Sequence, residues 1–152
     1  MMKALISLIF LLYSATLSSQ ERITLLFVGD LMQHRAQIDA ARTSNGKYDY
    51  SPCFSLVKEE ISRADIAIGN LEVTLGGKPY QGYPTFSAPD EYLQAIKDVG
   101  FDVLLTANNH CLDRGKAGLE RTITQIESFS IPYAGTYRNA IERKQLYPLF
   151  IR

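Results

Sequence analysis

Three apolar runs, each followed at once by polar residues, constrain the fold of this chain more than any other feature. They span residues 23–28 (ITLLFV), 65–69 (DIAIG) and 102–107 (DVLLTA). Short continuous runs with β-branched residues are typical of strands that are buried on both faces of a parallel or mixed sheet. We therefore predict three such strands.

Helix signals separate these strands. Helices are predicted over residues 33–42, 51–63, 89–99 and 116–129. Ser51 is the expected N-cap of the second helix, with Pro52 at its first position, and Gly100 is the expected left-handed cap that ends the third. Residues 131–134 and 146–151 are predicted as a fourth strand and the start of another. This alternation of strands and helices predicts an α/β fold.

The first residues have the pattern of an export signal. Lys3 gives a positive start, residues 4–12 are almost entirely apolar, and small residues fill 14–19. We predict a signal peptide over residues 1–19, and hence export to the periplasm, the cell envelope or the extracellular space. An uncleaved anchor or a buried helix is the alternative interpretation. Residues 22–152 are then predicted to form one domain.

Composition excludes some classes of partner. Lys and Arg number 16 and Asp and Glu also number 16, so the chain has no basic field that would attract nucleic acid. The two cysteines, Cys53 and Cys111, are too few for a disulfide framework. We expect both to be free and mostly buried.

The polar residues after the three strands are expected to meet. Asp30 follows the first strand, residues 70–72 (NLE) follow the second, and 108–110 (NNH) follow the third. Parallel strands of an open α/β sheet end at the same edge, where ligands bind. Carboxylate, amide and imidazole groups are ligands of divalent cations such as Mn, Zn, Fe or Mg. The convergence therefore predicts a metal site, in which a metal would activate water and His110 would donate a proton.

Each of these residues also has a structural interpretation. Asp30 could cap the next helix, Asn109 could adopt a left-handed turn, and His110 could be a structural histidine. Asn70 could close a turn, and Glu72 could be a surface acid at a strand end. His34 is interpreted as a solvated helix residue, and Cys111 is not expected to face His110 productively.

Several segments together resemble a known family. The motifs are residues 29–32 (GDLM), 69–72 (GNLE) and 108–115 (NNHCLDRG), with 86–89 (FSAP) and 95–102 (AIKDVGFD) preceding the third motif. In this order they resemble CapA-like capsule synthesis proteins, the PGA_cap group of the calcineurin-like metallophosphoesterase superfamily. The resemblance extends over about residues 23–135.

The resemblance implies a four-layer α/β/β/α sandwich with two divalent metal ions. Asp30 would bind the first metal, Glu72 with Asn70 would occupy the bridging region, and Asn109 would bind the second metal. His110 would be the proton donor near the substrate. Asp113 would orient His110 through a hydrogen bond.

The sequence departs from the general phosphoesterase pattern in two respects. Met32 stands where that pattern has a histidine, and the only histidines are His34 and His110, so the later histidine motifs are missing. We therefore expect the N-terminal half of the sandwich, truncated at the C-terminus, with apolar sheet surface left uncovered. A short protein completed by a partner or by a second copy is the alternative.

Two functions follow from the resemblance. The first is metal-dependent hydrolysis or transfer at a phosphoester or related bond, during export of an anionic capsule polymer of the poly-γ-glutamate type. On this view the completed domain is active and these 152 residues alone are inactive. The second is a non-catalytic envelope component that guides or anchors the polymer. The expected partners are an anionic polymer or phosphoester substrate and membrane-associated capsule machinery, with no nucleic acid.

Overall fold

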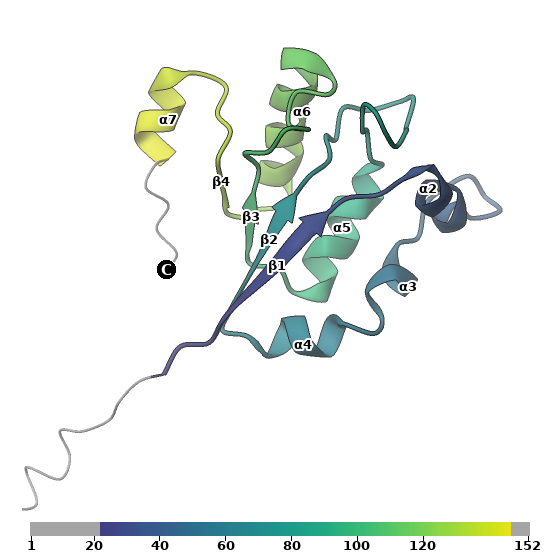
Figure 1. The fold of residues 1–152 in the computed structure, drawn as a ribbon, viewed down its shortest axis with the longest axis horizontal. Helices are drawn as coiled ribbons and strands as arrows, with labels where there is room; N and C mark the ends of the chain where they lie inside the picture. Colours follow the sequence, from purple (N-terminus) through teal and green to yellow (C-terminus); the bar gives the residue numbers. More distant parts are fainter. Residues whose placement is uncertain (1–21, 147–152) are drawn as a thin grey trace, which may run out of the picture.

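A computed structural model of the chain describes residues 22–146. Within this range, four strands lie in one parallel sheet whose spatial order is the order of the chain (Figure 1). The strands are β1 (Leu25–Leu31), β2 (Ile66–Leu71), β3 (Val103–Leu105) and β4 (Tyr133–Ala134). Parallel neighbours need crossover connections, and helices supply them here. The predicted α/β fold, with a parallel sheet and flanking helices, is confirmed.

Six helices occupy the described range. They are α2 (Arg35–Ala41), α3 (Ser51–Phe54), α4 (Lys58–Arg63), α5 (Asp90–Val99), α6 (Gly115–Ser128) and α7 (Ala140–Leu146). Gly100 ends α5 in the left-handed conformation at φ 109°, as the sequence predicted. Helix α7 was not predicted, and the strand expected at 146–151 falls almost entirely outside the described residues.

The predicted helix over residues 51–63 is wrong in two respects. It is divided into α3 and α4, and the hydroxyl of Ser55 donates to the carbonyl of Pro52 at the break. Side-chain bonds of this kind compete with the helical ladder. Ser51 is also not the N-cap but the first residue of α3. Its backbone N–H and hydroxyl donate to the Asp49 carboxylate at 2.9 and 2.6 Å.

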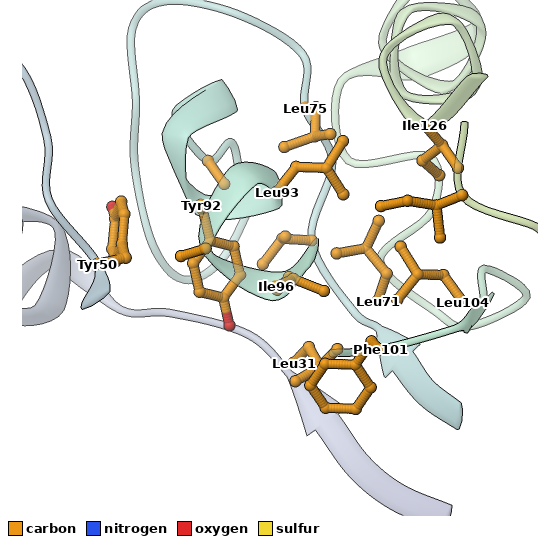
Figure 2. Packing of buried hydrophobic residues seen from close by; sticks show 14 of the residues in the cluster. Leu31, Tyr50, Leu71, Leu75, Tyr92, Leu93, Ile96, Phe101, Leu104 and Ile126 are labelled. Atoms are coloured by element: carbon orange, nitrogen blue, oxygen red, sulfur yellow. The ribbon is translucent and has the colours of Figure 1, made fainter. Parts of the chain in front are cut away.

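The hydrophobic core lies on one face of the sheet. Ala67 and Leu104 point to this face and are fully buried. Leu93 and Ile96 of α5 and Ile126 of α6 pack against them and are also fully buried (Figure 2). The two longest helices therefore cover the same side of the sheet.

The other face of the sheet is open along β1 and at Leu105, whereas Val103, which pairs with Ile68, is buried there. Leu25, Phe27 and Leu105 are 51%, 68% and 42% exposed. Pairing of Leu25 with Ile66 and of Phe27 with Ile68 places their half-buried partners on the same face. The predicted uncovered apolar surface is therefore confirmed, and the architecture is consistent with part of a metallophosphoesterase-like domain.

The two faces predict opposite responses to substitution. Leu104→Ala should lower the free energy of unfolding by about 2–5 kcal/mol, because it removes a fully buried side chain. Phe27→Thr should change it by less than about 0.5 kcal/mol, because the ring is largely exposed already and threonine suits a strand. Urea denaturation of both variants tests this contrast. A loss at Phe27 as large as that at Leu104 would show that the open face is covered in solution.

Other expectations concern the cysteines and the membrane. Both cysteines are free as predicted, but Cys53 is exposed, which corrects the expectation of burial. It lies on α3, a single turn with no buried residue. Across residues 22–146, every helix is too short or too polar to cross a bilayer. The predicted signal peptide at 1–19 lies outside the described residues.

Candidate functional site

The ends of β1 and β2 bring two carboxylates together. Asp30 lies within β1 and pairs with Asn70 of β2, so the strand continues further into the first motif than predicted. The register shifts between Val28 and Asp30, which marks an irregularity beside the site. Glu72 directly follows β2, and its backbone N–H donates to the Leu31 carbonyl at 3.1 Å. Backbone pairing alone therefore fixes the positions from which Asp30 and Glu72 converge.

The side-chain amide of Asn70 lies between these carboxylates. Its Nδ2 donates to Asp30 Oδ1 at 2.9 Å and to Glu72 Oε2 at 2.7 Å. The repulsion expected between two neighbouring carboxylates is thus offset by a shared hydrogen-bond donor. Asp30, Asn70 and Glu72, three of the predicted site residues, are in contact.

The two carboxyl groups have opposite pKa shifts. The hydrogen bond from Asn70, and then the interaction with Glu72, lower the pKa of Asp30. Burial, and then the hydrogen bond and negative charge of Asp30, raise the pKa of Glu72. The directions of these shifts favour Glu72 over Asp30 as the carboxyl group that binds a proton first when pH falls.

Asn108 connects this pair to the third motif, a role that the sequence analysis did not assign. Its Nδ2 donates to Asn70 Oδ1 at 3.1 Å and to the Leu71 carbonyl at 2.9 Å. Its Oδ1 accepts the backbone N–H of His110 at 3.1 Å. The sequence did contain a sign of this role, because Asn108 is the first residue after the strand predicted over residues 102–107. Asn108 therefore positions both Asn70 and the loop that carries His110.

Asn109, the predicted second-metal ligand, lies differently. It is exposed, and among the described residues no hydrogen bond joins its side chain to Asp30, Asn70 or Glu72. Asn108 is half-buried and bonded to the end of β2, whereas Asn109, the next residue of the turn, is exposed. Its role as a ligand stays a prediction.

His110 and Asp113 form a fixed pair. His110 Nδ1 and Asp113 Oδ2 are 2.8 Å apart, and the two side chains are only 15% and 10% exposed. The same Asp113 oxygen accepts the backbone N–H of Phe86 at 2.7 Å. The predicted hydrogen bond is therefore present. An acceptor at Nδ1 favours the tautomer that carries its proton there, which leaves Nε2 for another partner.

An aromatic wall supports the imidazole. The Phe86 ring meets the His110 ring edge-on, with centroids 4.6 Å apart, and meets the His34 ring in the same way at 5.2 Å. Phe86 is 1% exposed, so it is a rigid support. His34 is exposed just before α2, as expected for a solvated residue, but its ring also contacts this wall. Phe86 was recognised only as part of a motif, and its contact with His110 was not predicted.

Two carboxylates of the site could hold a divalent cation between them. Within residues 22–146, no three His, Cys, Asp or Glu side chains gather as a metal-binding group. Asp30 and Glu72, however, flank a single hydrogen-bond donor, and a cation could replace that donor between them. Oxygen ligands of this kind suit Mg or Mn better than thiolate-preferring metals.

Comparisons with known proteins agree with this arrangement of motifs. The family described as bacterial capsule synthesis protein PGA_cap matches residues 24–150. The chain is 28% identical over 132 residues to "Capsule biosynthesis protein CapA" of Bacillus anthracis, covering 83% of this chain and 31% of that protein. It is 32% identical over 121 residues to "Uncharacterized protein y4uA" of Sinorhizobium fredii, covering 74% of this chain and 24% of that protein.

The matches cover most of this chain but only a small part of its relatives. The chain spans less than a third of the length of these curated relatives. The family model, in contrast, matches nearly all of the residues that carry the sheet, the three motifs and the helices between them. The chain therefore belongs to the bacterial capsule synthesis protein PGA_cap family.

Proposed function

We propose that this chain contributes a divalent-metal site to a protein of capsule biosynthesis, and that the site serves hydrolysis or transfer at a phosphoester or related bond. The observation that carries the proposal is the convergence of Asp30 and Glu72 on one hydrogen-bond donor at the carboxyl end of a parallel sheet. The substrate is an anionic polymer of the poly-γ-glutamate type or a phosphoester precursor of it. The relative from Bacillus anthracis is named a capsule biosynthesis protein, which supports the link to capsule formation.

Each side chain has a separate role in this proposal. Asp30 and Glu72 would hold the metal, with Asn70 beside them, and Asn109 would reach it from the exposed side of the loop. When bound, a divalent metal supplies a Lewis acid and an activated water molecule. Asn108 would hold Asn70 and the loop that carries His110 in position through its hydrogen bonds to both.

His110 would handle the proton. In its protonated form the ring can donate from Nε2 to a leaving oxygen, while Asp113 at Nδ1 stabilises the positive charge. Phe86 holds the ring from one side and also fixes Asp113 through its backbone N–H. The geometry therefore supports proton donation from Nε2, because Nδ1 is bonded to Asp113.

The location and partners of the protein belong to the same proposal. Residues 1–19 have the sequence pattern of an export signal, which supports work in the cell envelope beside membrane-associated capsule machinery. The balanced charge of the chain gives no reason to expect a nucleic acid partner.

Titration of the chain with Mn²⁺ by calorimetry tests the metal site. Glu72→Gln should weaken binding at least about tenfold, because it removes one of the two ligand charges while keeping the side-chain shape. Glu60→Gln, an exposed acid on α4, is the matched control and should leave the affinity unchanged. Equal affinities in the two variants, or no binding by the unmodified chain, would contradict the proposal.

A non-catalytic envelope component is the second candidate. It is favoured by one observation: Asn70 already donates to both carboxylates, so the pair is satisfied without a cation. In that case a strain with His110→Ala would keep its capsule at normal protein levels. Loss of the capsule in that strain would exclude this candidate.

A further inference from the structure

A basic groove lies on the surface between α2 and residues 78–80. It has a volume of about 490 Å³. Arg35 and Arg42 line it from α2 and its C-cap, and Lys78 lines it from the facing loop. All three side chains are exposed. The groove is thus open to a ligand along its length.

The charges in the groove are unbalanced. Three cations line it against one acid, Asp39, whose Oδ2 is 3.0 Å from Arg35 Nε. Arg35 and Asp39 form an exposed ion pair one helical turn apart. Arg42 and Lys78 therefore supply the net positive charge of the groove. Separated positive charges in a concave surface concentrate the local field and favour an anionic ligand with several charged groups.

Two tyrosines shape the groove between these charges. The rings of Tyr48 and Tyr80 meet edge-on with centroids 5.5 Å apart, and both residues are half-buried. Their rings therefore form a firm apolar surface in the groove. Such a surface suits the neutral stretches between the charges of a polymer.

The groove is held against the candidate site by contacts on both walls. Gly82, in the loop that follows the groove, packs directly on α2: a Cβ atom there would lie 2.8 Å from His34 Cα and 2.7 Å from Arg35 N. Arg114, next to Asp113, donates from its guanidinium to the Pro79 carbonyl at 2.9 Å. The loop that carries His110 thus braces the groove wall.

We propose that this groove binds a segment of a polycarboxylate chain and holds it beside the candidate site. The inference rests on the proposed function in taking an anionic polymer as the ligand, and adds where on the surface the polymer lies. A polycarboxylate fits better than a polyphosphate, because Asp39 and the tyrosines interrupt the positive charges. A polyphosphate is more densely charged and would place negative groups against Asp39 and against the tyrosine rings.

Fluorescence anisotropy with labelled poly-L-glutamate tests the inference. The buffer contains EDTA, so that binding is measured without any divalent metal. The groove variant Arg42→Gln with Lys78→Gln should bind about tenfold more weakly than the unmodified chain, since each exposed charge pair lost weakens binding about two- to fivefold. The control variant Arg143→Gln with Lys144→Gln removes two charges from α7, which lies beyond β4, whereas α2 lies beyond the end of β1 (Figure 1). It should change the affinity less than about twofold.

A second measurement does not depend on substitutions. Addition of unlabelled poly-L-glutamate to the ¹⁵N-labelled chain should shift the amide signals of residues 35–42, Lys78 and Tyr80 the most. Four results would overturn the inference: no binding by the unmodified chain, equal weakening in both double variants, shifts centred elsewhere, or tighter binding of a polyphosphate of equal charge. If the chain does not bind Mn²⁺ in the calorimetric titration, that result counts against the metal site alone, because the poly-L-glutamate measurement is made in EDTA without metal.

Discussion

Gly135→Ala is expected to lower the free energy of unfolding by about 3 kcal/mol, the largest loss foreseen for a single methyl group in this chain. Gly135 follows β4 with φ at 126°, a conformation that residues with a side chain rarely adopt. A Cβ atom there would also lie 2.5 Å from Ala107 N and 2.8 Å from Ala107 Cβ. Backbone strain and a clash with another backbone segment therefore act together.

The effect should reach the candidate site, because Ala107 immediately precedes Asn108. Thr136 is tied to Thr106 by its backbone N–H at 3.0 Å and its hydroxyl at 2.8 Å, so the two segments cannot separate freely. Urea denaturation measures the loss. Gly29→Ala is the control, since a Cβ atom there meets nothing within 4 Å. If the two variants are equally stable, the close approach of Gly135 to Ala107 does not exist in solution.

Asp113→Asn is expected to release His110 and to lower the free energy of unfolding by about 1–3 kcal/mol. One carboxylate oxygen accepts both the Phe86 N–H and the His110 Nδ1 proton. An asparagine oxygen in that place carries no negative charge, so both hydrogen bonds would lose their charge assistance and the His110 ring would be held less firmly. In a protein with the proposed activity, loss of this orientation should reduce the rate about 10- to 100-fold.

The ¹⁵N chemical shifts of the His110 ring report the change directly, because they distinguish the two tautomers. Asp102→Asn is the matched control: Asp102 also accepts a backbone N–H, from Ala67 at 2.7 Å, but it is bonded to no histidine. This control should lose stability and leave the His110 signals unchanged. Unchanged signals in Asp113→Asn as well would show that Asp113 supports the loop without orienting the ring.

Local patterns in the sequence were sufficient for most of the framework. Apolar runs gave the strands, and helical spacing gave the buried face of α5, where Tyr92, Leu93 and Ile96 all pack inward. The convergence of Asp30 with Asn70 and Glu72 was also predictable, because parallel strands that carry polar residues at their ends present them at one edge.

Features that depend on partners distant in the sequence were not predicted. The exposed position of Cys53 depends on how its segment meets the core. The division of residues 51–63 into two helices coincides instead with a local bond, from Ser55 to Pro52, which helical spacing did not reveal. Helix α7 has no buried residue, so its sequence lacks the apolar spacing that predicts a helix. Arg138, just before α7, is instead paired with Glu127 of α6.

The polar site shows the same division between sequence and tertiary structure. Residue type and strand order predicted that Asp30, Asn70, Glu72 and His110 lie at one edge of the sheet. Only the tertiary structure decided that Asn108, and not Asn109, joins them, because its partners Asn70 and Leu71 lie 38 and 37 positions away in the chain. It also placed the amide of Asn70 between the two carboxylates and the Phe86 ring against His110. Spacing in the sequence indicates which strand end carries a side chain, whereas the direction of that side chain depends on the hydrogen bonds and packing available after the strands have assembled.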